Sequence, residues 1–120
     1  MAKCIMIVDD SASMRQMVSF TLKKAGYDVV EAVNGKDGCD KIKQSKVDLI
    51  VTDLNMPEMN GIDFIREVRL NPGYKFTPVL MLTTESQKDK IDEGKKVGCS
   101  GWIVKPFSPE HLLATIQKMV

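Results

Sequence analysis

Short apolar runs alternate with amphipathic segments along the whole chain. Apolar runs that lack a polar alternation are typical of strands covered on both faces, as in a parallel sheet. The run at 27–32 is the weakest, because only Tyr27, Val29 and Val30 supply its larger apolar side chains. The pattern predicts five strands, at Lys3–Val8, Tyr27–Ala32, Asp48–Thr52, Pro78–Leu82 and Gly101–Val104.

The segments between these runs have the periodicity of helices. Apolar residues between Met14 and Ala25 recur at three- and four-residue intervals, and Ser13 with Gln16 matches a capping box. The segment 87–97 has few apolar residues, so we expect an exposed, thinly anchored helix there. Further helices are predicted over 36–45, over 61–70 and after Ser108, which precedes a proline, with Asn34 and Asn60 as N-caps.

Strands that alternate with helices form right-handed crossovers and build an open α/β sheet. We therefore predict a doubly wound, five-stranded parallel sheet with helices on both faces, in one domain over residues 1–120. In such sheets, ligands bind outside the carboxyl ends of the strands, where the strand order reverses.

Chemically active side chains stand at these predicted strand ends. Asp9 and Asp10 follow the first strand, Asp53 the third, Thr83 the fourth and Lys105 the fifth. Three carboxylates on one rim repel one another unless a cation neutralises them, and Mg²⁺ takes a few carboxylates while keeping several waters. The alternative is that the first two acids only cap the next helix and the third begins a turn.

Composition argues against several kinds of partner. Seventeen Lys plus Arg against sixteen Asp plus Glu leave a net charge of +1, which gives no electrostatic reason to expect nucleic acid or an anionic membrane. No apolar run reaches the length of a membrane span, and the N-terminus lacks the regions of a signal peptide. Cys4, Cys39 and Cys99 fit no close metal-ligand spacing and indicate reduced thiols. We expect a cytoplasmic protein.

The ordered combination of motifs resembles the receiver domain of two-component response regulators, in particular the stand-alone chemotaxis (CheY-like) type. The resemblance implies the strand order 2-1-3-4-5, which is taken from the family and not from spacing. It also implies a cis peptide bond between Lys105 and Pro106. The match covers essentially all 120 residues and rests on Val8-Asp9-Asp10, Asp53, Met56–Gly61, Thr83 and Lys105-Pro106-Phe107.

The resemblance assigns a phosphoryl-acceptor and metal site. Asp53 would accept a phosphoryl group from a histidine kinase, so that the chain acts as a switch and catalyses only its own phosphotransfer and dephosphorylation. Asp10, Asp53 and the backbone carbonyl of Asn55 would ligate Mg²⁺, and Asp9 would orient a metal-bound water. A metal and a nearby lysine supply the countercharge that phosphoryl transfer to a carboxylate requires.

The resemblance also assigns the residues that respond to phosphorylation. Thr83 would donate its hydroxyl to a phosphoryl oxygen, and Lys105 would pair with the phosphate. Trp102 stands where chemotaxis members usually carry tyrosine, and this aromatic side chain would move into the space that Thr83 leaves. Asn55 and Glu85 occupy the positions at which the family tunes the loss of phosphate.

Output through a binding event follows from the absence of a second domain in these 120 residues. We expect a monomer that binds a downstream target, a flagellar motor switch in a chemotaxis pathway. The expected surface comprises the fourth helix, the fifth strand and the last helix, around Ile91, Lys95, Lys96, Trp102 and Met119.

Three alternatives remain open. An aspartyl phosphatase would place a second aspartate two residues after the nucleophile, where this chain has Asn55. A flavodoxin-like nucleotide binder would have Gly, Ser or Thr in the first loop, and Asp9 and Asp10 would repel its phosphates. A degenerate receiver would bind partners without phosphorylation.

Overall fold

Five parallel strands form the central sheet, in the order β2-β1-β3-β4-β5. The computed structural model describes residues 2–84 and 88–120. All five predicted strands and the family's strand order are confirmed. Strands β3 and β4 each run one residue further than predicted, so Asp53 and Thr83 are the last residues of their strands. The strands are β1 (Cys4–Val8), β2 (Asp28–Ala32), β3 (Leu49–Asp53), β4 (Val79–Thr83) and β5 (Gly101–Val104).

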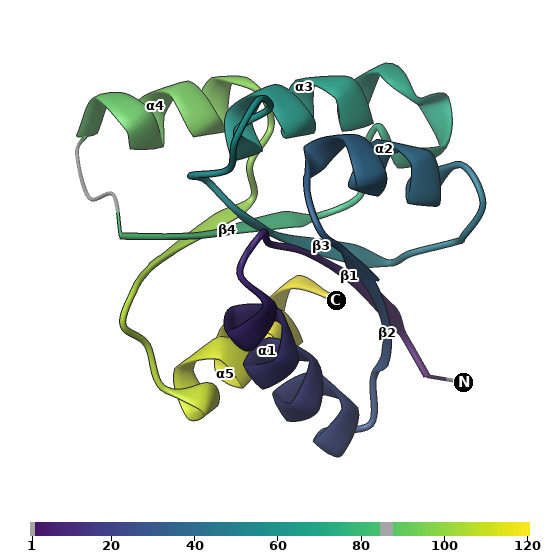
Figure 1. Ribbon diagram of the computed structural model, residues 1–120, viewed down its shortest axis with the longest axis vertical. Helices are drawn as coiled ribbons and strands as arrows, with labels where there is room; N and C mark the ends of the chain where they lie inside the picture. Colours follow the sequence, from purple (N-terminus) through teal and green to yellow (C-terminus); the bar gives the residue numbers. More distant parts are fainter. Residues whose placement is uncertain (1, 85–87) are drawn as a thin grey trace.

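Helices cover both faces of this sheet, which confirms the doubly wound α/β class. The helices α1 (Ala12–Lys24) and α5 (Pro109–Met119) lie on one face (Figure 1). The other face is covered by α2 (Gly35–Ile42), α3 (Gly61–Leu70) and α4 (Lys88–Lys96). A short 3₁₀ helix, η1 (Pro72–Tyr74), precedes β4 and was not predicted. No helix in the described part of the chain is long and apolar enough to cross a bilayer.

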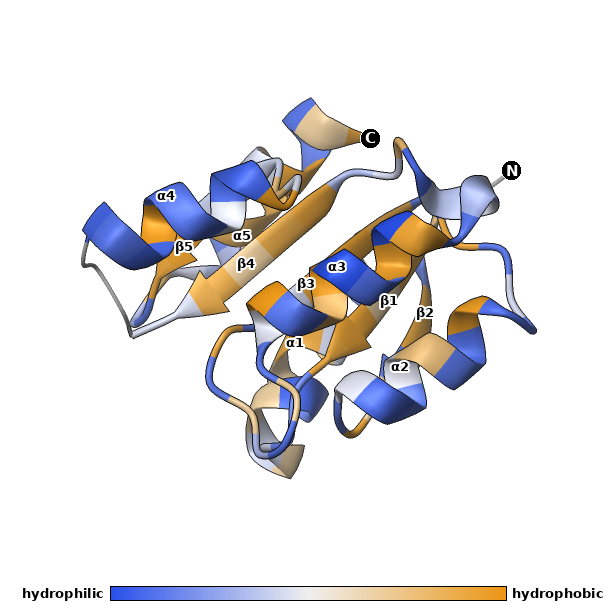
Figure 2. Ribbon diagram, turned by 90° about the horizontal axis from the view of Figure 1, so that it is seen from above, coloured by the Kyte–Doolittle hydropathy of each residue, from blue (hydrophilic) through white to orange (hydrophobic). Residues whose placement is uncertain are grey.

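The sheet separates two hydrophobic cores. Because successive strand residues point to opposite faces, Ile5 and Ile7 pack with α1 and α5, whereas Met6 and Val8 pack with α2 and α3. The strands are hydrophobic almost throughout, whereas the helices above them alternate hydrophilic and hydrophobic residues (Figure 2). This burial on both faces explains why the strand sequences show no alternation.

Ser11 caps α1, where the sequence predicted Ser13. The Ser11 hydroxyl accepts a hydrogen bond from the Met14 backbone N–H at 3.3 Å. The predicted capping box with Gln16 is therefore wrong. The Asp9 carboxylate accepts a hydrogen bond from the Ser11 backbone N–H at 2.9 Å. Because this contact fixes the turn at Ser11, the helix begins two residues earlier than predicted. The other predicted N-caps are confirmed at Asn34, Asn60 and Ser108.

The α4 helix is thinly anchored, as predicted. Among its residues Lys88–Lys96, only Gly94 is buried. Residues 85–87, which include Glu85 and the predicted first residue of this helix, lie outside the described residues. After β5, the peptide bond between Lys105 and Pro106 is cis, which confirms that prediction.

Candidate functional site

Three carboxylates meet at the carboxyl end of the sheet. Asp9 and Asp10 follow β1, and Asp53 ends the neighbouring strand β3. One carboxylate oxygen from each lies within 4.8 Å of the other two. The side chains of Asp9 and Asp53 are buried, whereas Asp10 is exposed. The convergence expected from topology is therefore present, with one acid open to solvent.

Lys105 supplies the one ammonium group that forms ion pairs with these acids among the described residues. Its Nζ lies 3.4 Å from Asp53 Oδ1 and 3.7 Å from Asp9 Oδ2. The Lys105 side chain is 16% exposed, so water screens these contacts incompletely. One positive charge faces three negative ones, which leaves the cluster short of positive charge.

Burial dominates the pKa shifts of the two buried acids. Burial raises the pKa of the Asp53 carboxyl, the Lys105 ammonium opposes that rise, and the charge on Asp9 adds to it. Burial also raises the pKa of Asp9, against the backbone N–H of Ser11 and the Lys105 ammonium. A divalent cation at this position would favour the ionised form of both carboxyls. The donors are carboxylate oxygens, which are the ligands that Mg²⁺ prefers.

Thr83 lies at the end of β4, the strand next to Asp53, and its side chain is buried. The Asn55 side-chain amide donates to the Thr83 hydroxyl oxygen at 3.3 Å. The backbone N–H of Lys105 donates to the Thr83 carbonyl at 2.7 Å. Hydrogen bonds therefore connect Thr83 both to Lys105 and to the loop that follows Asp53.

The loop between β3 and α3 returns directly onto the end of β3. The Asn55 backbone N–H lowers the pKa of the Asp53 carboxyl, and the Gly61 N–H donates to the Leu54 carbonyl at 2.8 Å. A Cβ atom on Gly61 would overlap the Asp53 carbonyl oxygen and lie 3.0 Å from Leu54 Cα. The glycine therefore allows α3 to begin against the backbone of the candidate acceptor.

Trp102 packs against α4. It lies opposite a residue of β4 that is two positions before Thr83. In the β4–β5 register, Trp102 pairs with Met81, whereas Thr83 pairs with Val104. The half-buried indole lies so close to Gly94 that a Cβ there would be 3.1 Å from the ring. The role of Trp102 as a switch stays a prediction.

Arg15 is a site residue that the sequence analysis missed. Its guanidinium donates to the Asp9 backbone carbonyl at 2.7 Å, and its Nε lies 3.6 Å from a Glu31 carboxylate oxygen. This contact holds the turn that carries Asp9 and Asp10. The available signal was a cation five residues after Asp10, the second acid of the pair.

Comparison with known proteins identifies the family. Residues 5–117 match the response regulator receiver domain. The chain is 40% identical over 110 residues to chemotaxis protein CheY1 of Helicobacter pylori, covering 90% of this chain and 89% of that protein. It is 39% identical over 121 residues to chemotaxis protein CheY of Thermotoga maritima, covering 99% and 98%. A structure of chemotaxis protein CheY4 of Vibrio cholerae has a TM-score of 0.97 and 49% identity, with both chains fully covered.

The chain therefore belongs to the response regulator receiver domain family, as its motifs predicted. Its homologues include chemotaxis response regulators, and the matched region contains the whole acidic cluster together with Lys105.

Proposed function

We propose that residues 1–120 form one receiver domain that accepts a phosphoryl group on Asp53 from the phosphohistidine of a histidine kinase. The observation that carries this proposal is the placement of Asp53. It is a carboxylate at the end of a central strand, beside two further carboxylates and 3.4 Å from the Lys105 ammonium. Family membership supports the same assignment.

The donor set fits a divalent cation. Asp10, Asp53 and the Asn55 backbone carbonyl would hold Mg²⁺, and Asp9 would orient a water bound to it. The ion supplies positive charge that neutralises phosphoryl oxygens and keeps the acceptor carboxylate ionised. Burial of Asp9 and Asp53 raises the pKa of each, and added positive charge would lower both pKa values again.

In the transfer, an oxygen of the Asp53 carboxylate forms a bond to phosphorus, and the P–N bond of phosphohistidine breaks. The bonding electron pair stays on the imidazole nitrogen, and Asp53 becomes an acyl phosphate. Lys105 pairs with the phosphoryl oxygens, and Thr83 donates its hydroxyl to one of them. Water later attacks phosphorus and restores the carboxylate, with Asn55 and Glu85 shaping access of that water. The chain thus catalyses only its own phosphorylation and dephosphorylation.

Output arises from the charge that the phosphoryl group adds, about −1.5 to −2 at neutral pH. Thr83 moves toward the new oxygens, and Trp102 follows toward the space behind β4. A cavity of about 60 Å³ lies beside the indole and is lined in part by Ile91, Lys95 and Cys99. The surface of α4, β5 and α5 then binds a downstream protein, a flagellar motor switch in a chemotaxis pathway, with the receiver as a monomer.

Labelling with radioactive acetyl phosphate in the presence of Mg²⁺ tests this function. We expect the wild type to take up label, Asp53→Asn to take up none, and chelation of the metal to stop labelling. Asp28→Asn is the matched control, because Asp28 is an exposed carboxylate at the opposite end of the sheet. Normal labelling of Asp53→Asn would refute the assignment, and a folded wild type that takes no label would indicate a degenerate receiver.

A further inference from the structure

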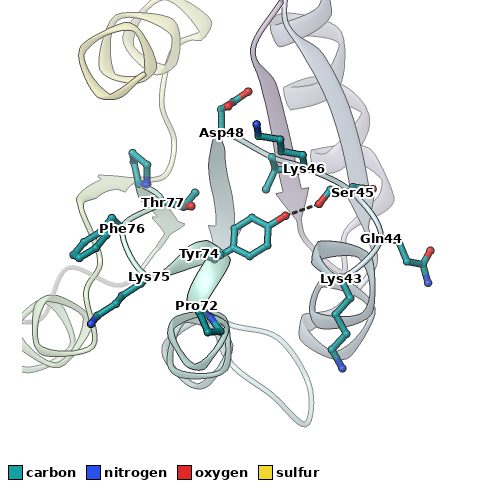
Figure 3. A pocket seen from close by; sticks show the side chains of 13 residues that line it. Lys43, Gln44, Ser45, Lys46, Asp48, Pro72, Tyr74, Lys75, Phe76 and Thr77 are labelled. Atoms are coloured by element: carbon teal, nitrogen blue, oxygen red, sulfur yellow. Dashed lines mark hydrogen bonds between the residues drawn. The ribbon is translucent and has the colours of Figure 1, made fainter.

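An open groove of about 650 Å³ lies at the end of the sheet opposite Asp53. Its walls are the loops that precede β3 and β4, residues 43–48 and 72–78. The Tyr74 ring lies between these loops, and its hydroxyl donates to the Ser45 carbonyl (Figure 3). The length of β3 separates this groove from Asp53 by about 13 Å. The groove is therefore a preformed surface distinct from the candidate phosphoryl-acceptor site.

The groove is positively charged. Lys43, Lys46 and Lys75 line it, and all three are exposed. None of their ammonium groups forms an ion pair with a carboxylate in the described part of the chain. Asp48 is the carboxylate in the lining, and it already accepts the Cys4 backbone N–H at 2.8 Å. Three lysines thus lie around the groove without an ion-pair partner among the described residues.

An exposed aromatic side chain stands beside these charges. Phe76 is 87% exposed, and the Lys75 ammonium lies 5.7 Å from the centre of its ring. Lys75 and Phe76 lie on one side of the Tyr74 ring, whereas Lys43 and Lys46 come from the loop on the other side (Figure 3). An exposed apolar ring beside one lysine, with two further lysines across the groove, favours a partner that carries both carboxylates and an apolar side chain.

We propose that this groove docks an acidic peptide segment of a partner protein, with an aromatic or aliphatic side chain among its carboxylates. The carboxylates pair with Lys43, Lys46 and Lys75, and the apolar side chain covers Phe76. The site is remote from Asp53, so a partner can dock there whether or not the acceptor is phosphorylated.

The lining favours a peptide over a nucleic acid. It contains no arginine, the residue whose planar fork recognises phosphate in two-point contacts. The buried Tyr74 ring already uses its hydroxyl within the protein, so Phe76 alone offers an exposed face for a base. The net charge of +1 supplies no long-range field for a polyanion.

Titration of the ¹⁵N-labelled full chain with a synthetic peptide of alternating glutamate and phenylalanine tests the proposal by NMR. We expect the amides of 43–48 and 72–78 to shift, with binding that weakens as salt is raised. The triple variant Lys43→Gln/Lys46→Gln/Lys75→Gln should weaken binding by about tenfold, from three exposed ion pairs. The matched control Lys23→Gln/Lys24→Gln/Lys118→Gln removes the same charge from exposed positions on α1 and α5 and should leave affinity within about twofold.

Two further experiments test the contribution of the apolar contact and the chemical class of the ligand. Phe76→Ala should weaken binding several-fold, whereas Phe20→Ala, which removes a 68% exposed phenylalanine on α1, should not. Shifts confined to other surfaces, or equal losses in both triple variants, would overturn the proposal. If a single-stranded DNA oligonucleotide bound the groove more tightly than the peptide does, the proposal would be overturned in favour of a nucleic-acid ligand. Unchanged peptide affinity in Asp53→Asn is expected, and a large loss would refute an independent site.

Discussion

Replacing Gly61 with alanine should damage both the stability of the fold and the candidate site. A new Cβ would overlap the Asp53 carbonyl oxygen and lie 2.7 Å from Met81 Sδ and 3.0 Å from Leu54 Cα. The flexible methionine can move away, but the backbone atoms move only if the end of β3 moves with them. Gly61 does not have a positive φ, so the need for glycine comes from this close approach alone.

The expected loss of stability is about 2 kcal/mol. Overpacking a tightly packed site costs about 1–3 kcal/mol, and the better helix propensity of alanine recovers less than about 1 kcal/mol at the first helical position. A chain of 120 residues has an unfolding entropy of about 0.25 kcal/mol/K. The melting temperature should therefore fall by about 8 °C.

Urea denaturation followed by circular dichroism measures this loss, and acetyl phosphate labelling measures the effect on the site. We expect Gly61→Ala to label about tenfold more slowly, because displacement of Asp53 disturbs the reacting geometry. Gly73→Ala is the matched control, since its Cβ would meet only Asn71 Oδ1, at 3.4 Å. A Gly61→Ala protein as stable and as readily labelled as Gly73→Ala would refute the steric reasoning.

Three other substitutions or probes test the electrostatics and the switch. Burial raises the pKa of Asp53 in the folded state, so its ionisation lowers stability as the pH rises above the ordinary carboxyl value. Asp53→Asn should therefore raise the free energy of unfolding of the metal-free protein at neutral pH, measured by urea titration, and this gain should disappear in acid. In a Mg²⁺ titration, Asp10→Asn should lose at least about tenfold in affinity and Thr83→Ala little; equal losses would contradict the separate metal and phosphate roles. Trp102 emission should shift when acetyl phosphate is added in the presence of Mg²⁺, and no change beyond the one that Mg²⁺ alone causes would refute the indole movement.

The strands and the rim of acids were predictable from the sequence for one physical reason. Buried parallel strands have uninterrupted apolar runs, and their carboxyl ends share one edge of the sheet. The convergence of Asp9, Asp10 and Asp53 follows from that topology. The N-cap of α1 did not follow, because Ser11 and Ser13 both precede the apolar face. The choice between them depends on the hydrogen bond from the Ser11 N–H to Asp9.

Contacts between segments distant in the sequence were not predictable in this way. Arg15 reaches Glu31 because β2 lies beside β1 in a particular register, and Trp102 rests against Gly94 because α4 packs over β5. The groove likewise depends on two loops joined by Tyr74. Such contacts are set by tertiary packing, which local periodicity does not encode.

Locating the phosphoryl group on the chain tests the proposed role of Asp53 most directly. Borohydride reduces an aspartyl phosphate to homoserine, and tandem mass spectrometry of the digested protein then identifies the reduced position. After incubation with acetyl phosphate and Mg²⁺, we expect homoserine at position 53 and at no other aspartate. Homoserine at Asp9 or Asp10 in place of position 53 would contradict the assignment of Asp53 as the acceptor.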